Sequence, residues 1–383
     1  MSNDPVYGLV CAGGGAHGAY QVGVLKYVHE HFCVGEASPF RVFSGTSAGS
    51  LNTSFFAAQS FDAHTSRLWL EQMWLDFHVP GYHGNVLKNS VLTLLKEWAK
   101  PRALRKPSWS LLDPAPLRDV VAKGFLRERF ERAIQEGTTL GLAVSATELR
   151  SSRLVWFQEG PEATSWLTPE SIGIQTRLGV THVQASCSVP IAFPPVRIDD
   201  HDYADGGVAN KRPFTPAVNM GATRILSIAT DQPLPHHLPE YPPDFKPHFG
   251  DTVSMLLDQI GHDYAVDQAM TIEAFNHFCR RSPGTENHEY PHILVGQDIH
   301  LSAYRPVEIH LFAPSRRIHY TDVFHPDLFD KALDSKTTTS LLFHKDFITP
   351  LIDLGYEDAR ERHDTLAEFF ERDRPARPLG LRS

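Results

Sequence analysis

Two glycine-rich segments near the N-terminus carry the residues best suited to chemistry. Gly13 to Gly18 reads Gly-Gly-Gly-Ala-His-Gly, and Gly45 to Gly49 reads Gly-Thr-Ser-Ala-Gly. In the second segment, small residues stand two before and two after a serine, the pattern of a nucleophile elbow that turns a strand sharply into a helix. Ser47 is therefore the candidate nucleophile for acyl transfer. An ordinary tight turn with a chance serine is the alternative, and the neighbouring glycine segment weighs against it.

The first segment suits the binding of an oxyanion. At a helix N-terminus, the backbone N–H groups of Gly14, Gly15 and Ala16 lack intrahelical partners and can stabilise developing negative charge. Gly13, Gly15 and Gly18 also match the G-x-G-x-x-G fingerprint of dinucleotide-binding loops. That fingerprint requires an acidic residue at the end of the second strand, which here ends in Phe-Ser-Gly. The missing acid argues against a dinucleotide site.

Both segments directly follow short apolar runs that predict buried strands. These runs are Tyr7 to Cys11 and Phe40 to Ser44, and the intervening Ala19 to His31 repeats its apolar residues near helical spacing. The pattern predicts a βαβ unit, whose right-handed crossover brings the carboxyl ends of both strands to one edge of the sheet. The two glycine segments should meet at that edge.

An activated serine needs a base, and Asp205 is the candidate. Two short apolar runs flank the polar turn Asp199 to Asp202, so a hairpin should deliver Asp205 into a loop where Gly206 and Gly207 permit close approach. The alternative is that Asp-Gly is simply a common turn dipeptide. Only one strand and one helix precede the elbow strand, so the topology differs from that of an α/β-hydrolase.

In their order, these blocks resemble the signature of the patatin-like phospholipases. The matching segments are Gly13 to Gly18, Gly45 to Gly49, Asp205 to Gly207, Leu112 to Arg118, and Ala185 to Pro190 followed by Phe193 to Pro195. The resemblance implies a Ser-Asp dyad without histidine, in which Ser47 is the nucleophile and Asp205 its direct base. It also implies hydrolysis of lipid esters, and this chemistry requires no cofactor.

One position departs from the family pattern. His17 stands where the family usually has Lys or Arg, so a fixed charge near the oxyanion loop is replaced by a group that titrates close to neutrality. Its side chain either points away from the chemistry or converts the dyad into a triad. A helix N-terminus disfavours the imidazolium that a general base must become, which argues against the triad.

Length and composition agree with an enzyme that has one large α/β domain and appendages. The chain has 383 residues, of which 42% are hydrophobic and 21% charged. Its net charge of -9 argues against general binding of nucleic acid. We expect a cytoplasmic protein, because there is no signal-peptide pattern and no run of eighteen apolar residues. Four sparse cysteines are expected to be reduced, and 21 scattered histidines predict no metal site.

The expected fold is a three-layer α/β/α patatin-like fold with a mainly parallel central sheet. Residues 6–218 form the predicted catalytic core, 219–355 continue the same α/β domain, and 356–383 form a charged terminal helix and tail. Beyond the signature blocks, the pattern predicts a strand at 224–229, a helix over about 252–278 and a strand at 307–312. The sheet should therefore extend past the catalytic core.

A basic stretch offers a peripheral contact with a membrane. Residues 86–106 hold six basic residues against one acid, a local charge of +5 within a chain of net charge -9. Their apolar residues recur at the spacing of one helical face, as in a helix lying in a membrane interface. A surface helix with its apolar face in the core is the alternative.

Together, these features predict a serine acyl hydrolase acting on phospholipids or lysophospholipids. The alternative function is a catalytically weak membrane-surface lipid-binding protein of the same fold, for which the departure at His17 is the hint. Intact Ser47 and Asp205 argue against that alternative.

Overall fold

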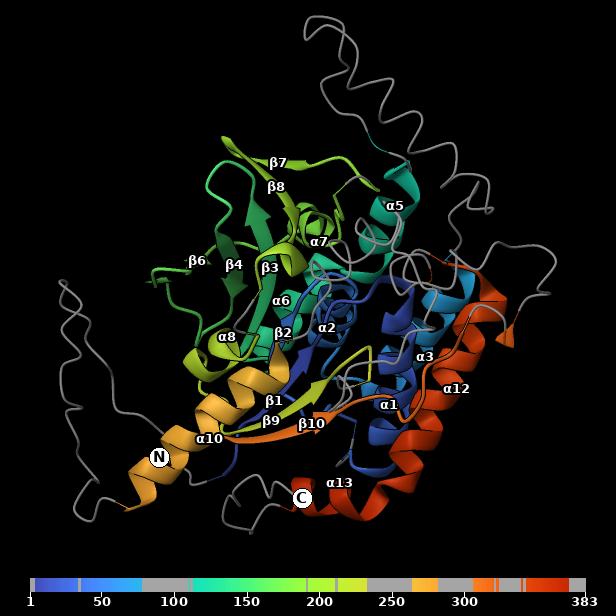
Figure 1. Ribbon diagram of the computed structural model, residues 1–383, viewed down its shortest axis with the longest axis vertical. Helices are drawn as coiled ribbons and strands as arrows, with labels where there is room; N and C mark the ends of the chain where they lie inside the picture. The colour runs from blue at the N-terminus through green and yellow to red at the C-terminus, as the bar shows by residue number, and fades with distance from the viewer. Residues whose placement is uncertain are drawn as a thin grey trace, which may run out of the picture.

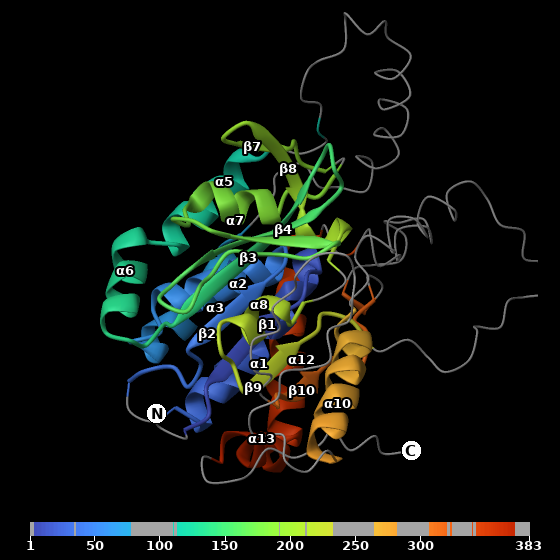
Figure 2. The same ribbon diagram turned by 90° about the vertical axis from the view of Figure 1, so that its left-hand side faces the viewer.

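The computed structural model shows a central sheet with helices on both of its faces (Figure 1 and Figure 2). It describes residues 4–33, 36–77, 110, 113–190, 192–210, 213–232, 264–281, 306–319, 322–323, 339 and 342–371. The basic stretch at 86–106 lies outside the described residues. The three layers are those that the sequence predicted.

Within the described part of the chain, the sheet has ten strands. They are β1 (Tyr7–Cys11), β2 (Val42–Gly45), β3 (Gly141–Glu148), β4 (Leu154–Glu159), β5 (Trp166–Leu167), β6 (Ser171–Gln175), β7 (Val196–Ile198), β8 (His201–Asp205), β9 (Arg224–Ile228) and β10 (Glu308–Phe312). Their order is β10-β9-β1-β2-β3-β4-β6-β5, and β8 pairs with both β3 and β7.

The half of the sheet that carries the candidate site is parallel. Neighbouring strands from β10 through β9, β1 and β2 to β3 all run in the same direction, whereas β3 pairs antiparallel with β4 and β8. Cys11 pairs with Gly45 on one side and with Ile228 on the other, so three carboxyl ends lie together. This arrangement confirms the predicted βαβ unit and the shared edge of the sheet.

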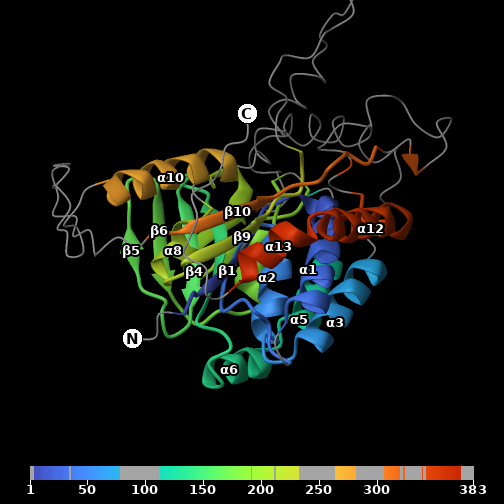
Figure 3. The same cartoon turned by 90° about the horizontal axis from the view of Figure 1, so that it is seen from below.

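Side chains of the parallel strands alternate between two hydrophobic cores. Leu9 and Cys11 belong to one core and Val10 to the other, and Phe43 and Val42 divide in the same way. Among the described elements, eight helices also contribute residues to the first core: α1 (Ala19–His31), α2 (Ala48–Ala58), α3 (Ala63–Asp76), α5 (Ala115–Gly124), α6 (Arg127–Gln135), α7 (Val180–Ser186), α12 (Lys345–Glu361) and α13 (His363–Phe370). The second core contains residues of α8 (Thr215–Asn219) and α10 (Ala265–Arg281). Seen from below, α10 lies on one side of the strands, and α1, α2 and α3 lie on the other (Figure 3). Because buried apolar side chains point to both faces of the sheet, the sequences of the parallel strands are nearly continuous apolar runs.

The described residues give bounds for the later helices. Helix α12 (Lys345–Glu361) spans the expected boundary at 356, and α13 (His363–Phe370) follows it. Helix α10 begins at Ala265 among the described residues, and the preceding residues 252–263 lie outside them. Helix α1, in contrast, has its predicted bounds.

Helix α12 crosses α1 in close contact, and the two lie side by side in Figure 1. A Cβ on Gly23 would lie 1.9 Å from the carbonyl oxygen of Ile352, and one on Gly355 would lie 2.1 Å from that of Tyr20. Near the crossing, the Tyr20 hydroxyl donates a hydrogen bond of 2.9 Å to the buried carboxylate of Asp358. The missing side chains let the two backbones touch.

Gly23→Ala is therefore expected to destabilise the fold. The new methyl group would press on backbone that cannot rotate aside, at a cost of about 1–3 kcal/mol, which should exceed the gain of up to about 1 kcal/mol in helix propensity. The midpoint of thermal unfolding should fall. Gly179→Ala is the control, because its Cβ would meet nothing within 4 Å. Equal stability of the two variants would contradict the close crossing.

Candidate active site

Ser47 lies in the sharp turn between β2 and α2. Its φ of 53° and ψ of -126° lie in a region that residues with side chains seldom adopt. A Cβ on Gly49 would lie 2.1 Å from the carbonyl oxygen of Cys11, and one on Gly45 would lie 2.4 Å from that of Gly49. Strand and helix thus approach too closely for side chains at the two positions where the sequence has glycine.

Asp205 ends β8, the second strand of the predicted hairpin. Strand β8 pairs antiparallel with β7, and it also pairs with β3, where Asp205 lies opposite Ala146. The backbone N–H of Asp205 donates to the carbonyl of Ser188 at 2.9 Å, and its carbonyl accepts from the Thr147 hydroxyl at 2.8 Å. A Cβ on Gly206 would lie 2.0 Å from the Ser145 hydroxyl oxygen, so the loop packs directly against β3. The base candidate is therefore fixed on both sides of its backbone.

The structure brings the side chains of Ser47 and Asp205 together in a buried place. Burial raises the pKa of Asp205 to about 7, and its contacts with the Ser47 side chain and the Gly207 N–H offset part of that rise. Oδ1 of Asp205 accepts the Gly207 N–H at 2.7 Å. Oδ2 is buried and has no hydrogen bond of regular geometry to any described residue, Ser47 included. A carboxyl with this pKa can accept a proton near neutral pH, and such nucleophile–base contacts often tighten only when substrate binds.

The loop from Gly13 to Gly18 lies beside Ser47. A Cβ on Gly13 would be 3.2 Å from the Cβ of Ser47, and Gly15 has a φ of 56°. Residues 15–18 form a 3-10 helix (η1) that leads into α1. Among the described residues, none accepts a hydrogen bond from the N–H of Gly14, Gly15 or Ala16. These N–H groups therefore remain the candidate oxyanion donors.

His17 is buried against C-terminal residues. Its Nε2 lies 2.9 Å from the Thr339 hydroxyl oxygen, and its ring centroid is 5.7 Å from that of Phe347 in the first turn of α12. These contacts direct the imidazole toward the C-terminal helices. They favour the interpretation in which the His17 side chain points away from the chemistry over the interpretation as part of a triad.

The end of α7 contacts both candidate catalytic residues, which sequence reasoning did not foresee. The Ser186 hydroxyl oxygen accepts the N–H of Ser47 at 3.0 Å, and the Cys187 thiol donates to the carbonyl of Ser47 at 3.2 Å. Burial, reinforced by the charge of Asp205, raises the pKa of Cys187, so the thiol keeps its proton. The resemblance marked residues 185–190, but spacing along the chain does not reveal a contact 139 positions away.

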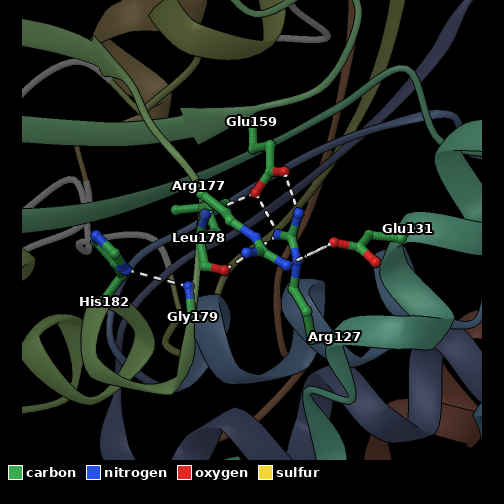
Figure 4. A network of polar contacts seen from close by, with 7 residues as sticks. All are labelled: Arg127, Glu131, Glu159, Arg177, Leu178, Gly179 and His182. Atoms are coloured by element: carbon green, nitrogen blue, oxygen red, sulfur yellow. Dashed lines mark hydrogen bonds and ion pairs between the residues drawn. The ribbon is translucent and has the colours of Figure 1, made fainter.

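A polar network fixes the other end of α7 (Figure 4). Arg127 forms two hydrogen bonds with Glu159, of 2.5 and 2.6 Å, and a third with the carbonyl of Leu178 at 3.1 Å. Glu159 also accepts the Leu178 N–H at 2.6 Å, and His182 Nδ1 accepts the Gly179 N–H at 3.1 Å. The helix that supports the turn of Ser47 is thus held at both ends.

Other expectations concern metals, thiols and membranes. The described residues contain no group of three or more His, Cys, Asp or Glu that could hold a metal ion, and in the acidic turn Asp202 pairs with Arg197 at 2.9 Å. Cys11, Cys33 and Cys187 are free thiols. Within the described ranges, no helix is long and apolar enough to cross a membrane.

Comparisons with known proteins identify relatives of the chain. The model of the patatin-like phospholipase family matches residues 9–218. The uncharacterized protein YjjU of Escherichia coli is 24% identical over 234 residues, which are 61% of this chain and 54% of that protein. The match thus spans about half the length of this relative.

Two solved structures also resemble the chain. VipD from Legionella pneumophila has a TM-score of 0.38 and 16% identity, covering 94% of this chain and 67% of VipD. Human GIVD cytosolic phospholipase A2, in complex with methyl gamma-linolenyl fluorophosphonate, has a TM-score of 0.42 and 11% identity, covering 96% of this chain and 59% of the human protein.

Asp205→Asn is expected to stabilise the protein, more strongly at pH 8 than at pH 5. Because the pKa is raised from 3.8 to about 7, ionised Asp205 opposes folding, and this cost grows as the pH rises between those values, to at most about 4 kcal/mol. Thermal unfolding of the wild type and of Asp205→Asn at both pH values measures this difference in stability. Asp202→Asn, on the same strand but partly exposed, is the control. A stability difference without pH dependence would contradict the raised pKa.

Proposed function

The chain belongs to the patatin-like phospholipases, and on that basis we propose that it is a serine acyl hydrolase of lipid esters with Ser47 and Asp205 as its catalytic dyad. The observation that carries the proposal is the buried carboxyl of Asp205 beside Ser47, a serine in a strained elbow: burial raises the pKa of Asp205 to about 7, and the contact with Ser47 offsets part of that rise. A carboxyl with this pKa is about half ionised at pH 7, and its ionised form gains a proton readily.

The geometry supports a two-step reaction. The Ser47 oxygen attacks the ester carbonyl while Asp205 takes the serine proton, and the N–H groups of Gly14, Gly15 and Ala16 stabilise the oxyanion. Asp205 then returns the proton to the leaving alcohol. Water attacks the acyl-enzyme with the same carboxylate as base, which releases the fatty acid and restores the Ser47 hydroxyl.

Phospholipids and lysophospholipids are the substrates we propose, on the basis of the family. A catalytically weak lipid-binding protein is the competing function, because His17 replaces the basic residue usual in the family. The two functions predict different behaviour of Ser47. In a hydrolase, Ser47 reacts with a lipid ester and with an acyl-like phosphonate, whereas in a lipid-binding protein it reacts with neither.

Ser47→Ala and Asp205→Asn are each expected to lower hydrolysis of a lysophospholipid by at least about 10³-fold, because loss of a nucleophile or its base removes the reaction path. A fluorophosphonate probe should label the wild type and leave Ser47→Ala unlabelled. Ser54→Ala is the matched control, since Ser54 lies on the same helix and its buried hydroxyl makes no hydrogen bond to described residues.

Retention of a tenth of wild-type turnover by either variant would overturn the dyad. A folded wild type that neither reacts with the probe nor hydrolyses any phospholipid would favour the lipid-binding alternative. Thermal unfolding of each variant excludes loss of activity through misfolding.

A second proposal concerns the route to the membrane, and it rests on sequence, since residues 86–106 lie outside the described part of the chain. Ser47→Ala protein should bind vesicles more tightly as anionic lipid increases, because each basic residue near such a surface contributes roughly 1 kcal/mol. Changing Lys96, Lys100, Arg102 and Arg105 to glutamine should abolish this dependence. The same change at the exposed Arg118, Lys123, Arg150 and Arg153 is the control of equal charge. Equal binding by both quadruple variants would place the docking face elsewhere.

A further inference from the structure

Two buried carboxamides hold the loop from Gly13 to Gly18 at both of its ends. Gln21 Nε2 donates to the carbonyl of Ala12 at 2.9 Å and to that of Ile228 at 3.0 Å. Asn52 Nδ2 donates to the carbonyl of Gly18 at 3.0 Å and to Gln21 Oε1 at 2.8 Å. Ala12 precedes the loop and Gly18 ends it. The two side chains therefore bracket the segment that carries the proposed oxyanion donors.

The orientation of both amides is determined by their partners. Trp74 Nε1 donates to Asn52 Oδ1 at 2.8 Å, and an indole N–H can only donate. Asn52 must therefore turn its Nδ2 toward Gly18 and Gln21. Gln21 accepts one of these bonds and consequently turns its own Nε2 toward the two carbonyls. Every amide hydrogen of the pair is used.

The network also fixes the loop relative to the candidate nucleophile. Asn52 lies on α2, the helix that begins directly after Ser47. The loop touches this helix: a Cβ on Gly18 would lie 2.7 Å from the Cβ of Ala48. Asn52 and Gln21 are both 0% exposed, so water cannot replace a bond that either side chain loses. A rigid link thus runs from the elbow helix to both ends of the glycine loop.

We infer that Gln21 and Asn52 are positioning residues for the oxyanion site, an inference that rests on the proposed hydrolase function. A loop built largely of glycine has few side chains of its own to hold it, yet oxyanion donors must lie within about 2.7–3.1 Å of the charged oxygen. A displacement of about 1 Å can lower a rate roughly 100-fold. The carboxamide pair supplies the restraint that the loop lacks.

The test measures kcat and KM for a lysophospholipid in Gln21→Met and Asn52→Leu, which keep side-chain size and remove the donors. The expected result is a fall in kcat of about 10- to 100-fold with KM changed less than about 3-fold, because displaced oxyanion donors weaken the transition state more than the bound substrate. Trp74→Phe, which keeps an aromatic side chain and removes the N–H that Asn52 Oδ1 accepts, should show a smaller fall in kcat. This milder variant keeps the test informative if the others do not fold.

The matched control is Asn276→Leu. Asn276 is equally buried and bonds through its carboxamide to both backbone groups of Val307, at 2.7 and 3.1 Å, between α10 and β10. It should lose stability like the other variants and keep its kcat. If the Gln21 and Asn52 variants retained the kcat of this control, the inference would be overturned while the hydrolase function stood. A wild type without Ser47-dependent hydrolysis would overturn the function, and the inference with it.

Discussion

The backbone conformation of Ser47 is the constraint on which the surrounding structure depends. A φ of 53° at a residue with a side chain costs roughly 1–3 kcal/mol, and it persists only where neighbours leave no alternative. Here the N–H of Ser47 donates to Ser186, while its carbonyl accepts from the Ser50 hydroxyl at 2.7 Å and from the Cys187 thiol. Relaxing the turn would leave these buried groups without partners, which costs more than the strain itself.

The packing that holds Ser47 also sets the chemistry of Asp205. The residues that follow α7 connect the two, because the Cys187 thiol bonds to the carbonyl of Ser47 and the Ser188 carbonyl accepts the N–H of Asp205. Burial in this packing takes the carboxyl of Asp205 out of water and raises its pKa. With a fully solvated aspartate at this position, the protein would be more stable, but the carboxylate would be a poorer base near neutral pH. The fold thus gives up stability at the position where the proposed reaction needs a proton acceptor.

Local sequence patterns predicted the elements that carry the site, whereas the contacts that support it are long-range. Helix α1 was predicted residue for residue, because its apolar spacing is a local property, and the Ser47 elbow followed from the small residues around it. The bond between Gln21 and Ile228 joins residues 207 positions apart, and no periodicity encodes such a pairing. Strand β5 is too short, at two residues, to show any alternation. The Trp74–Asn52 bond is closer in sequence, but it links two helices whose packing depends on the completed fold.

The residues beyond the family match complete the layers around the site. Strand β9 pairs in parallel with β1 along its whole length, and the Thr230 hydroxyl just after it donates to the carbonyl of Gly13 at 2.6 Å. Helix α12 covers α1 at the Gly23 crossing, and Phe347 in the first turn of α12 contacts His17. Each end of the loop from Gly13 to Gly18 therefore rests on a later part of the chain. Without β9 and α12, β1 would lose a parallel partner and the apolar face of α1 would be exposed, so the geometry of the loop depends on residues well outside the signature blocks.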